Sequence, residues 1–195
     1  SGLTIINPVI NLEQYADGSL NLPKLELKGK QPPILLTGLV IENGKFIFLD
    51  KKINSEGYRI IADKINGRIY KVMFPPTSKN IKFDISVCLI HPNGAKLGDV
   101  STLGWIDFGP KDMDANLEIK DLDITYFAPY YGNFVSNRKL LSAKLNLTST
   151  LKAENNDLAV VSNLRLSDLV YAKDEPPKEG ELPTLDLAKN TLDLF

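Results

Sequence analysis

The single histidine and the single cysteine are the first candidates for acid–base or nucleophilic chemistry. His91 precedes the turn sequence Pro92-Asn93-Gly94 and has no acid, nucleophile or second ligand beside it, so we expect a solvated turn residue. Cys88 lies within an apparent strand without a nearby base, which favours a buried, inert thiol. The sequence has no HExxH, CxxC, GxSxG or phosphate-binding glycine motif. It therefore predicts no enzyme, no metal site and no cofactor.

Carboxylates and aromatic residues offer two further kinds of chemistry. The acidic residues alternate with apolar ones, as on the wet face of a sheet, and a carboxylate pair for glycoside hydrolysis is an open alternative that no spacing indicates. A dense aromatic run surrounds Pro129 and could stack on carbohydrate, but its density favours a short helical plug packed on the end of a sheet. The run contains Tyr126, Phe127, Tyr130, Tyr131 and Phe134.

Composition limits the functional classes further. The chain has 195 residues, 43% hydrophobic and 24% charged, which suits one globular domain. Its 23 basic and 24 acidic residues are scattered and give a net charge of −1, which argues against nucleic acid or an anionic membrane surface as a partner. We find no apolar run near the roughly 20 residues that span a bilayer.

Alternation of apolar and polar residues is the dominant pattern. Between Ile81 and Leu89 every second side chain is apolar, and similar segments recur with almost no helical periodicity between them. We predict an all-β fold, mainly antiparallel, in which a long, curved and twisted sheet forms a groove. One or two short helices complete it, including the start of a helix at the C-terminus.

Turn residues divide this pattern into strands. Asn43-Gly44 predicts a tight hairpin turn within 39–50, and Asn66-Gly67 predicts a second turn between strands 58–62 and 68–73. Pro8 predicts a break in the strand over 3–13, at a sheet edge or a bulge. A short helix is expected around 22–25. The remaining predicted strands cover 81–90, 97–108, 113–124, 141–153 and 157–172.

The C-terminal segment has a different period. Leu185, Ala188, Leu192 and Phe195 are three or four residues apart, as on one face of an amphipathic helix. We expect a β-groove domain over 1–181 and, over 182–195, the start of a helix that leads to a next segment. The chain is interpreted as part of a longer protein.

A one-sided sheet without covering helices leaves an apolar face to be closed or occupied. Leaving a large apolar side chain in water costs roughly 1.5–3 kcal/mol. Trp105 and the phenylalanines suit a plain core as well as a ligand groove. The candidate groove-lining residues are Phe46, Phe48, Phe83, Ile85, Val87, Leu117, Ile119, Leu145 and Leu147.

Several short motifs, in their order, resemble the AsmA-like proteins of Gram-negative envelopes. The motifs are Asn7-Pro8-Val9, residues 17–22, residues 38–50, residues 65–69, Phe127-Ala128-Pro129-Tyr130-Tyr131 and residues 185–188. The resemblance covers most of the chain. It implies a repeating, taco-shaped β-groove in the periplasm, anchored in the inner membrane by an N-terminal helix. It also implies transport of phospholipid between the membranes during outer membrane biogenesis, without chemistry.

Two functional hypotheses follow. The first is a lipid-binding module whose partners are phospholipid or another acyl-chain lipid, neighbouring repeats, and copies of itself through open sheet edges. The second is a non-catalytic structural or interaction module, a β-sandwich whose apolar faces pack on each other. An enzyme acting on envelope glycans or lipids is a distant third, because it needs converging carboxylates.

Overall fold

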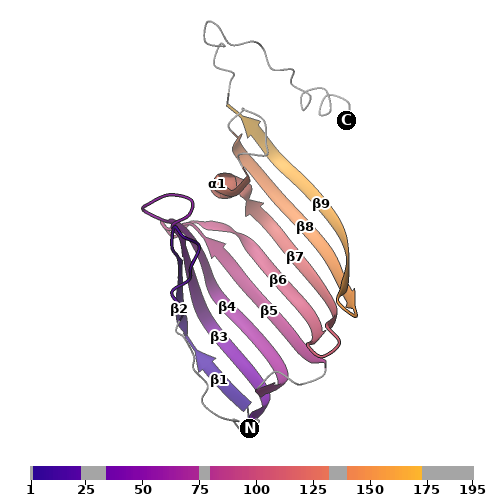
Figure 1. Cartoon of the computed structure of the whole chain (residues 1–195). Coiled ribbons are helices and arrows are strands. Elements are labelled where there is room, and N and C mark those ends of the chain that lie inside the picture. The colour runs from indigo at the N-terminus through magenta and orange to yellow at the C-terminus, as the bar shows by residue number, and fades with distance from the viewer. Residues whose placement is uncertain (1, 23–33, 75–79, 132–139, 173–195) are drawn as a thin grey trace, which may run out of the picture.

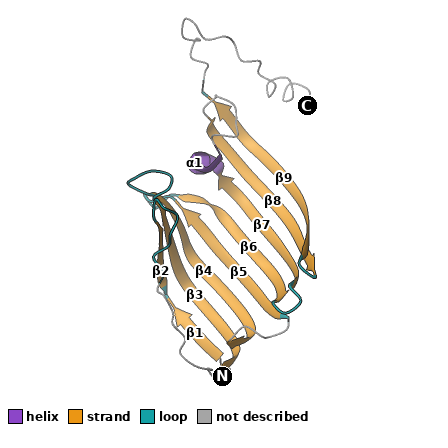
Figure 2. Cartoon of the chain, in the orientation of Figure 1, coloured by secondary structure: helices purple, strands orange, loops and turns teal. Residues whose placement is uncertain are grey.

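The computed structural model describes residues 2–22, 34–74, 80–131 and 140–172, which form one open, curved sheet of nine strands (Figure 1). The only helical segment in these ranges is short and follows β7 (Figure 2). The elements are β1 (Gly2–Ile6), β2 (Val9–Gln14), β3 (Ile34–Asp50), β4 (Tyr58–Phe74), β5 (Ile81–Ile90), β6 (Lys96–Asp107), β7 (Asp112–Asp123), η1 (Ile124–Phe127), α1 (Ala128–Tyr131), β8 (Leu140–Glu154) and β9 (Asp157–Tyr171). The predicted fold class is confirmed.

The strands form a simple meander. From β3 to β9 each strand pairs antiparallel with the next one in the chain. At the other edge, β1 and β2 both pair parallel with β3, one after the other. The predicted break at Pro8 separates them, and Asn7 has a positive φ of 53°. This edge is therefore made of two short strands.

Pairing register separates an apolar face from a polar face. Residues directly opposite each other on neighbouring strands project from the same side of a sheet. One row across the sheet is apolar at every position, and the parallel rows beside it are mainly apolar. This row is Leu3, Leu39, Ile69, Phe83, Gly104, Ala115, Leu151 and Val160. We call this side the apolar face and the other side the polar face.

The sheet has no second layer within the described residues. None of the large side chains described is completely buried. The buried hydrophobic residues are few: Ile61, Ile81, Leu97, Ala115, Leu122 and Ala143. The expected alternative of two facing sheets is therefore not the architecture of the described residues, which form a single sheet.

The predicted hairpin at Asn43-Gly44 is wrong. Strand β3 continues through these residues from Ile34 to Asp50, and its register with β4 shifts on both sides of Gly44. The positive φ of Asn43, 52°, here serves a β-bulge within the strand. The bulge moves the alternation by one position. Phe46 consequently stays on the same face as Ile41.

The turn predicted at Asn66-Gly67 is wrong for the same reason. Strand β4 runs unbroken from Tyr58 to Phe74, with a bulge between Asp63 and Asn66 where Lys64 has a φ of 50°. The Asn66 side chain accepts a hydrogen bond from the backbone N–H of Asn43 at 3.1 Å. The two bulges therefore lie beside each other and support each other.

The predicted turn after His91 is confirmed, and further turns lie at Asp17-Gly18 and between β8 and β9. The Gly94 N–H donates to the carbonyl of His91 at 2.8 Å, and the Gly18 N–H donates to that of Tyr15 at the same distance. Asn155 and Asn156 join β8 to β9. The helix expected around 22–25 falls mainly outside the described residues. The C-terminal helix and the domain boundary at 181 lie wholly outside them.

Candidate functional site: the apolar face

All nine predicted groove residues lie on the apolar face. Phe46 on β3 lies opposite Ala62 on β4, and Ala62 lies opposite Leu89 on β5. Leu89 is two positions from Val87 on the same strand and therefore shares its face. Val100 joins Val87 to Ile119 in another row, which continues to Leu147 and Leu164. The structure thus brings together residues from four strands that are distant in the sequence. The nine are Phe46, Phe48, Phe83, Ile85, Val87, Leu117, Ile119, Leu145 and Leu147, and each is half-buried.

Trp105 does not belong to this set. It pairs with Lys82 on one side and with Asp114 on the other, so it lies on the polar face. Several residues that the prediction omitted share the rows of the nine, and strand alternation alone would have identified most of them. They are Leu39, Ile41, Ile69, Leu89, Leu122 and Leu151.

Small residues lie in the middle of this face, at Gly104 and Ala115. A Cβ on Gly104 would lie 2.4 Å from the Asp114 carbonyl oxygen and 2.7 Å from the Ala115 Cβ. β6 and β7 therefore approach closely where Gly104 opposes Ala115. Farther along, the hydroxyls of Ser149 and Ser162 are 2.7 Å apart, so each satisfies the other on an otherwise apolar surface.

The described part of the aromatic run, which ends at Tyr131, forms a plug at one end of the apolar face, as predicted; Phe134 lies outside the described residues. Asp123 caps η1, because its carboxylate accepts a hydrogen bond from the Thr125 N–H at 3.0 Å. The Tyr58 hydroxyl donates to the carbonyl of Tyr126, and the Tyr126 hydroxyl donates to that of Arg59. The segment that follows β7 thus reaches β4, three strands away, within the curve of the sheet (Figure 1).

Ring contacts and burial hold this plug together. The Tyr58 ring centroid is 5.0 Å from that of Tyr126, whose ring is tilted by 37°, and 5.6 Å from that of Tyr130, whose ring is nearly perpendicular to it. Burial raises the pKa of both the Tyr58 and Tyr130 hydroxyls well above the ordinary tyrosine value. These hydroxyls consequently remain protonated donors at neutral pH.

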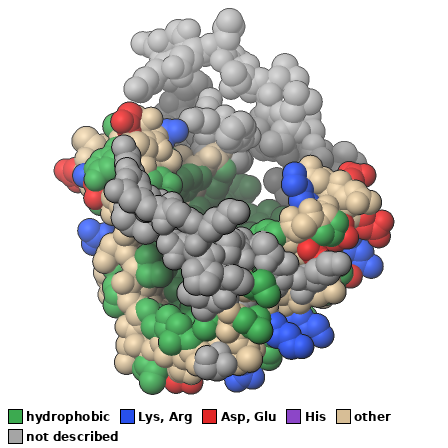
Figure 3. Space-filling view, turned by 60° about the horizontal axis from the view of Figure 1, so that its bottom comes forward, with side chains coloured by type: hydrophobic (Ala, Val, Ile, Leu, Met, Phe, Trp, Pro, Cys, Tyr) green, Lys and Arg blue, Asp and Glu red, His purple; other side chains and the backbone are tan. Residues whose placement is uncertain are grey.

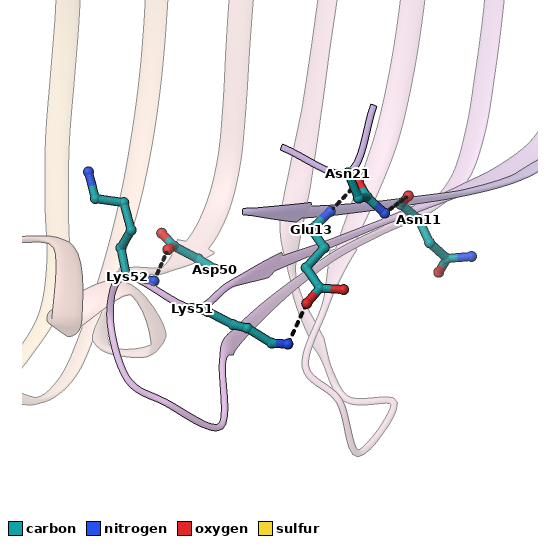
Figure 4. A network of polar contacts seen from close by, with 6 residues as sticks. All are labelled: Asn11, Glu13, Asn21, Asp50, Lys51 and Lys52. Carbon is teal, nitrogen blue, oxygen red and sulfur yellow. Dashed lines mark hydrogen bonds and ion pairs between the residues drawn. The ribbon is translucent and has the colours of Figure 1, made fainter. Parts of the chain in front are cut away.

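Asp50 anchors the far side of the plug. Its carboxylate is 5% exposed and accepts hydrogen bonds from the Tyr130 hydroxyl at 3.1 Å and the Lys52 N–H at 2.9 Å. Beside it, Lys51 forms an ion pair with Glu13, whose N–H donates to the Asn21 side chain at 2.8 Å (Figure 4). This network ties the end of β2 to the β3–β4 connection on which the plug rests.

Charged residues concentrate on the polar face. Ion pairs there include Lys45–Asp63 at 3.2 Å and Lys152–Asp114 at 3.8 Å. Figure 3 shows a hollow lined by hydrophobic side chains, with Lys, Arg, Asp and Glu around the outside. A hollow of about 620 Å³ is lined mostly by polar-face residues, among them Asn116, Thr148, Val161 and Asn163.

The candidate chemical residues do not converge. His91 lies in the predicted turn but is half-buried, because its ring packs 4.9 Å from that of Tyr126. Cys88 is half-buried rather than buried, and desolvation raises the pKa of its thiol, which disfavours the reactive thiolate. The described residues contain no group of three or more His, Cys, Asp or Glu side chains that could hold a metal ion.

Comparisons of the chain with family models, curated proteins and solved structures find no match. Among the helices of the described ranges, none has the length and hydropathy needed to cross a membrane. The class that the geometry defines is a single curved sheet with a one-sided apolar lining and a plug at one end.

Proposed function

We propose that this chain is a non-catalytic lipid-binding module that shields the acyl chains of a phospholipid, or of a similar lipid, against its apolar face. The observation that carries the proposal is the common face of the nine half-buried residues, without a second protein layer over it in the described ranges. A contiguous apolar patch of this kind on a monomer usually marks a binding surface.

The energy of such binding is sufficient without a specific polar site. Moving an acyl chain of about 16 carbons from water to an apolar surface gains on the order of 10 kcal/mol, at about 0.8 kcal/mol per methylene. The contact is non-directional, so no single residue is expected to dominate it. The described part of the apolar face accordingly offers few polar side chains, of which Ser149 and Ser162 satisfy each other.

The dimensions also suit a lipid. Strand β3 has 17 residues and β8 has 15. At about 3.3 Å per residue, 15 residues span about 50 Å, more than the roughly 30 Å hydrocarbon core of a bilayer. The plug covers one end of this length, so we infer that acyl chains lie beyond it, over the rows through Phe83 and Leu147.

The resemblance supports a location and a wider role. AsmA-like proteins lie in the periplasm with an inner-membrane anchor, and we propose that this module contributes there to phospholipid transport toward the outer membrane. Neighbouring repeats would then extend the groove. This part of the proposal depends on the resemblance alone.

Photocrosslinking tests the proposal directly. A photoreactive amino acid at Phe83 or Leu147, followed by lipid extraction and mass spectrometry after purification from bacteria, should yield crosslinked lipid. The same group at Lys82, which is exposed on the polar face, is the matched control and should yield none. If lipid crosslinked as strongly at Lys82 as at the apolar-face positions, or at none of them, a structural module would be favoured.

Charge substitution gives a second readout. Ile85→Asp and Leu145→Asp place a carboxylate on the apolar face and should abolish lipid pickup in native mass spectrometry. Ser86→Asp adds the same charge on the neighbouring, exposed polar-face position and should leave pickup unchanged. Unfolding of the first two variants would indicate plain core, and the crosslinking experiment on the folded protein would then decide between the two functions.

A further inference from the structure

The outer edge of β9 lacks a pairing strand in the described part of the chain. β9 is last in the strand order and pairs only with β8, along 15 residues. The opposite edge is different, because the short strands β1 and β2 are separated by Pro8 there. A long, regular edge with free N–H and C=O groups is a template for a further strand.

Side chains on both faces of β9 are unusually exposed. On the polar face, Val161 is 74% exposed. On the apolar face, the exposed fractions are 55% for Leu158, 51% for Val160 and 58% for Leu164. Exposed hydrophobic side chains along an unpaired edge favour pairing with another strand, because its side chains would cover them on both faces of the sheet.

The charges of β9 are arranged symmetrically about Val161. Asp157 lies four residues before it and Arg165 four residues after it, both exposed on the polar face. Within the described residues, neither side chain forms an ion pair with another group. An antiparallel β9 from a second copy, centred on Val161, would place Asp157 of each chain opposite Arg165 of the other.

We propose that the chain forms a two-fold dimer in which β9 pairs antiparallel with β9 of a second copy, with Val161 at the axis. Leu158 then lies opposite Leu164 of the second copy, and Val160 lies opposite Ser162. Polar-face residues meet polar-face residues throughout, so the two apolar faces become one continuous surface. The positive φ of Asp168, 56°, ends the regular part of the edge beyond this register.

Neighbouring registers lack the charge match. Centring the pair on Asn163 would place Arg165 opposite Val161 and Asp157 opposite Leu169. Both ion pairs would be lost. Opposite charges facing each other across two strands stabilise the pair, and like charges destabilise it. The sequence of β9 therefore favours self-pairing about Val161 over these alternatives.

Cysteine crosslinking tests the register. In a Cys88→Ala background, Val161→Cys places two thiols opposite each other, with Cα atoms about 4.5–5.5 Å apart, and mild oxidation should give a disulfide-linked dimer. Asn163→Cys is the control, because its two copies would lie about 13 Å apart and should not crosslink. Crosslinking at Asn163 but not at Val161 would overturn the proposal.

Charge reversal tests the interface in solution, without lipid. Sedimentation velocity of the whole chain should show a concentration-dependent dimer, and Arg165→Asp should weaken it about tenfold by turning two attractions into repulsions. Adding Asp157→Arg to that variant should restore the dimer. A wild-type chain that stays monomeric, or a dimer that Arg165→Asp leaves unchanged, would overturn the proposal whether or not the apolar face binds lipid.

Discussion

The hydroxyl of Tyr58, at the start of β4, donates a hydrogen bond to the backbone carbonyl of Tyr126, 68 residues later in η1. Their ring centroids are 5.0 Å apart. This contact joins β4 to the segment that follows β7, three strands away in the sheet, so it depends on the curvature of the sheet as well as on the two residues. The plug is therefore a sensitive reporter of the fold.

Removing that hydroxyl should loosen the plug. We expect Tyr58→Phe to lower the free energy of unfolding by about 0.5–1.5 kcal/mol, because the carbonyl of Tyr126 loses a half-buried donor. Urea unfolding followed by tyrosine fluorescence measures this difference. Tyr15→Phe, at a residue that is 41% exposed, serves as the control and should change stability by less.

Alkaline pH should destabilise the protein through the same tyrosines. Burial raises the pKa of the Tyr58 and Tyr130 hydroxyls in the folded state above the value of about 10 expected in the unfolded chain. The folded state therefore holds these protons more tightly. Their contribution to stability is complete below about pH 10 and decreases as pH rises from there through the folded-state pKa values.

The corresponding measurement is the urea midpoint between about pH 8 and pH 12. A decline that begins near about pH 10 and is shallower in Tyr58→Phe than in the wild type is expected. If both proteins showed the same dependence, Tyr58 would not titrate differently in the folded and unfolded states.

Because β6 and β7 approach closely at Gly104, we expect a larger residue at this position to destabilise the protein. Gly104→Ala would bring a methyl group within 2.4–2.7 Å of Asp114 and Ala115 atoms, most of them backbone, and should cost about 1–3 kcal/mol. Gly67→Ala is the matched control on the same face, because the nearest atom to its added Cβ would be 3.6 Å away. Thermal unfolding compares the two, and equal stability would mean that β6 and β7 separate without cost.

The hydrogen bond between the two bulges predicts that the exposed side-chain amide of Asn66 contributes to stability. Asn66→Ala removes the side-chain acceptor of the Asn43 N–H and should destabilise the protein by about 1 kcal/mol. Hydrogen exchange at the Asn43 amide should accelerate in this variant. Asn163→Ala, an exposed amide on β9, should leave both quantities unchanged.

Alternation was the part of the fold that could be predicted from residues alone. A strand has a period of two, so Ile81, Phe83, Ile85, Val87 and Leu89 had to share one side wherever the strand lay in the sheet. The same reasoning identified the nine lining residues. The antiparallel pairing of β5 with β6 followed from the short turn after His91.

The Asn-Gly pairs show where local reasoning was insufficient. Asn43 and Gly44 supply the flexible backbone that a tight turn requires, but a bulge requires it too. Whether the chain reverses or continues depends on the strand beside it. Here Asn66 on β4 satisfies the Asn43 N–H, and β3 continues through the bulge.

The amino-acid sequence by itself determined the strand content, the two-sided character of each strand and the aromatic plug segment, because these depend on periodicity and local composition. Only the tertiary structure decided between the predicted single curved sheet and the alternative of two facing sheets, and showed that the plug reaches Tyr58 and Asp50. It also decided that Trp105 lies on the polar face. The reason is that pairing register and curvature arise from contacts between distant segments, which no local pattern specifies.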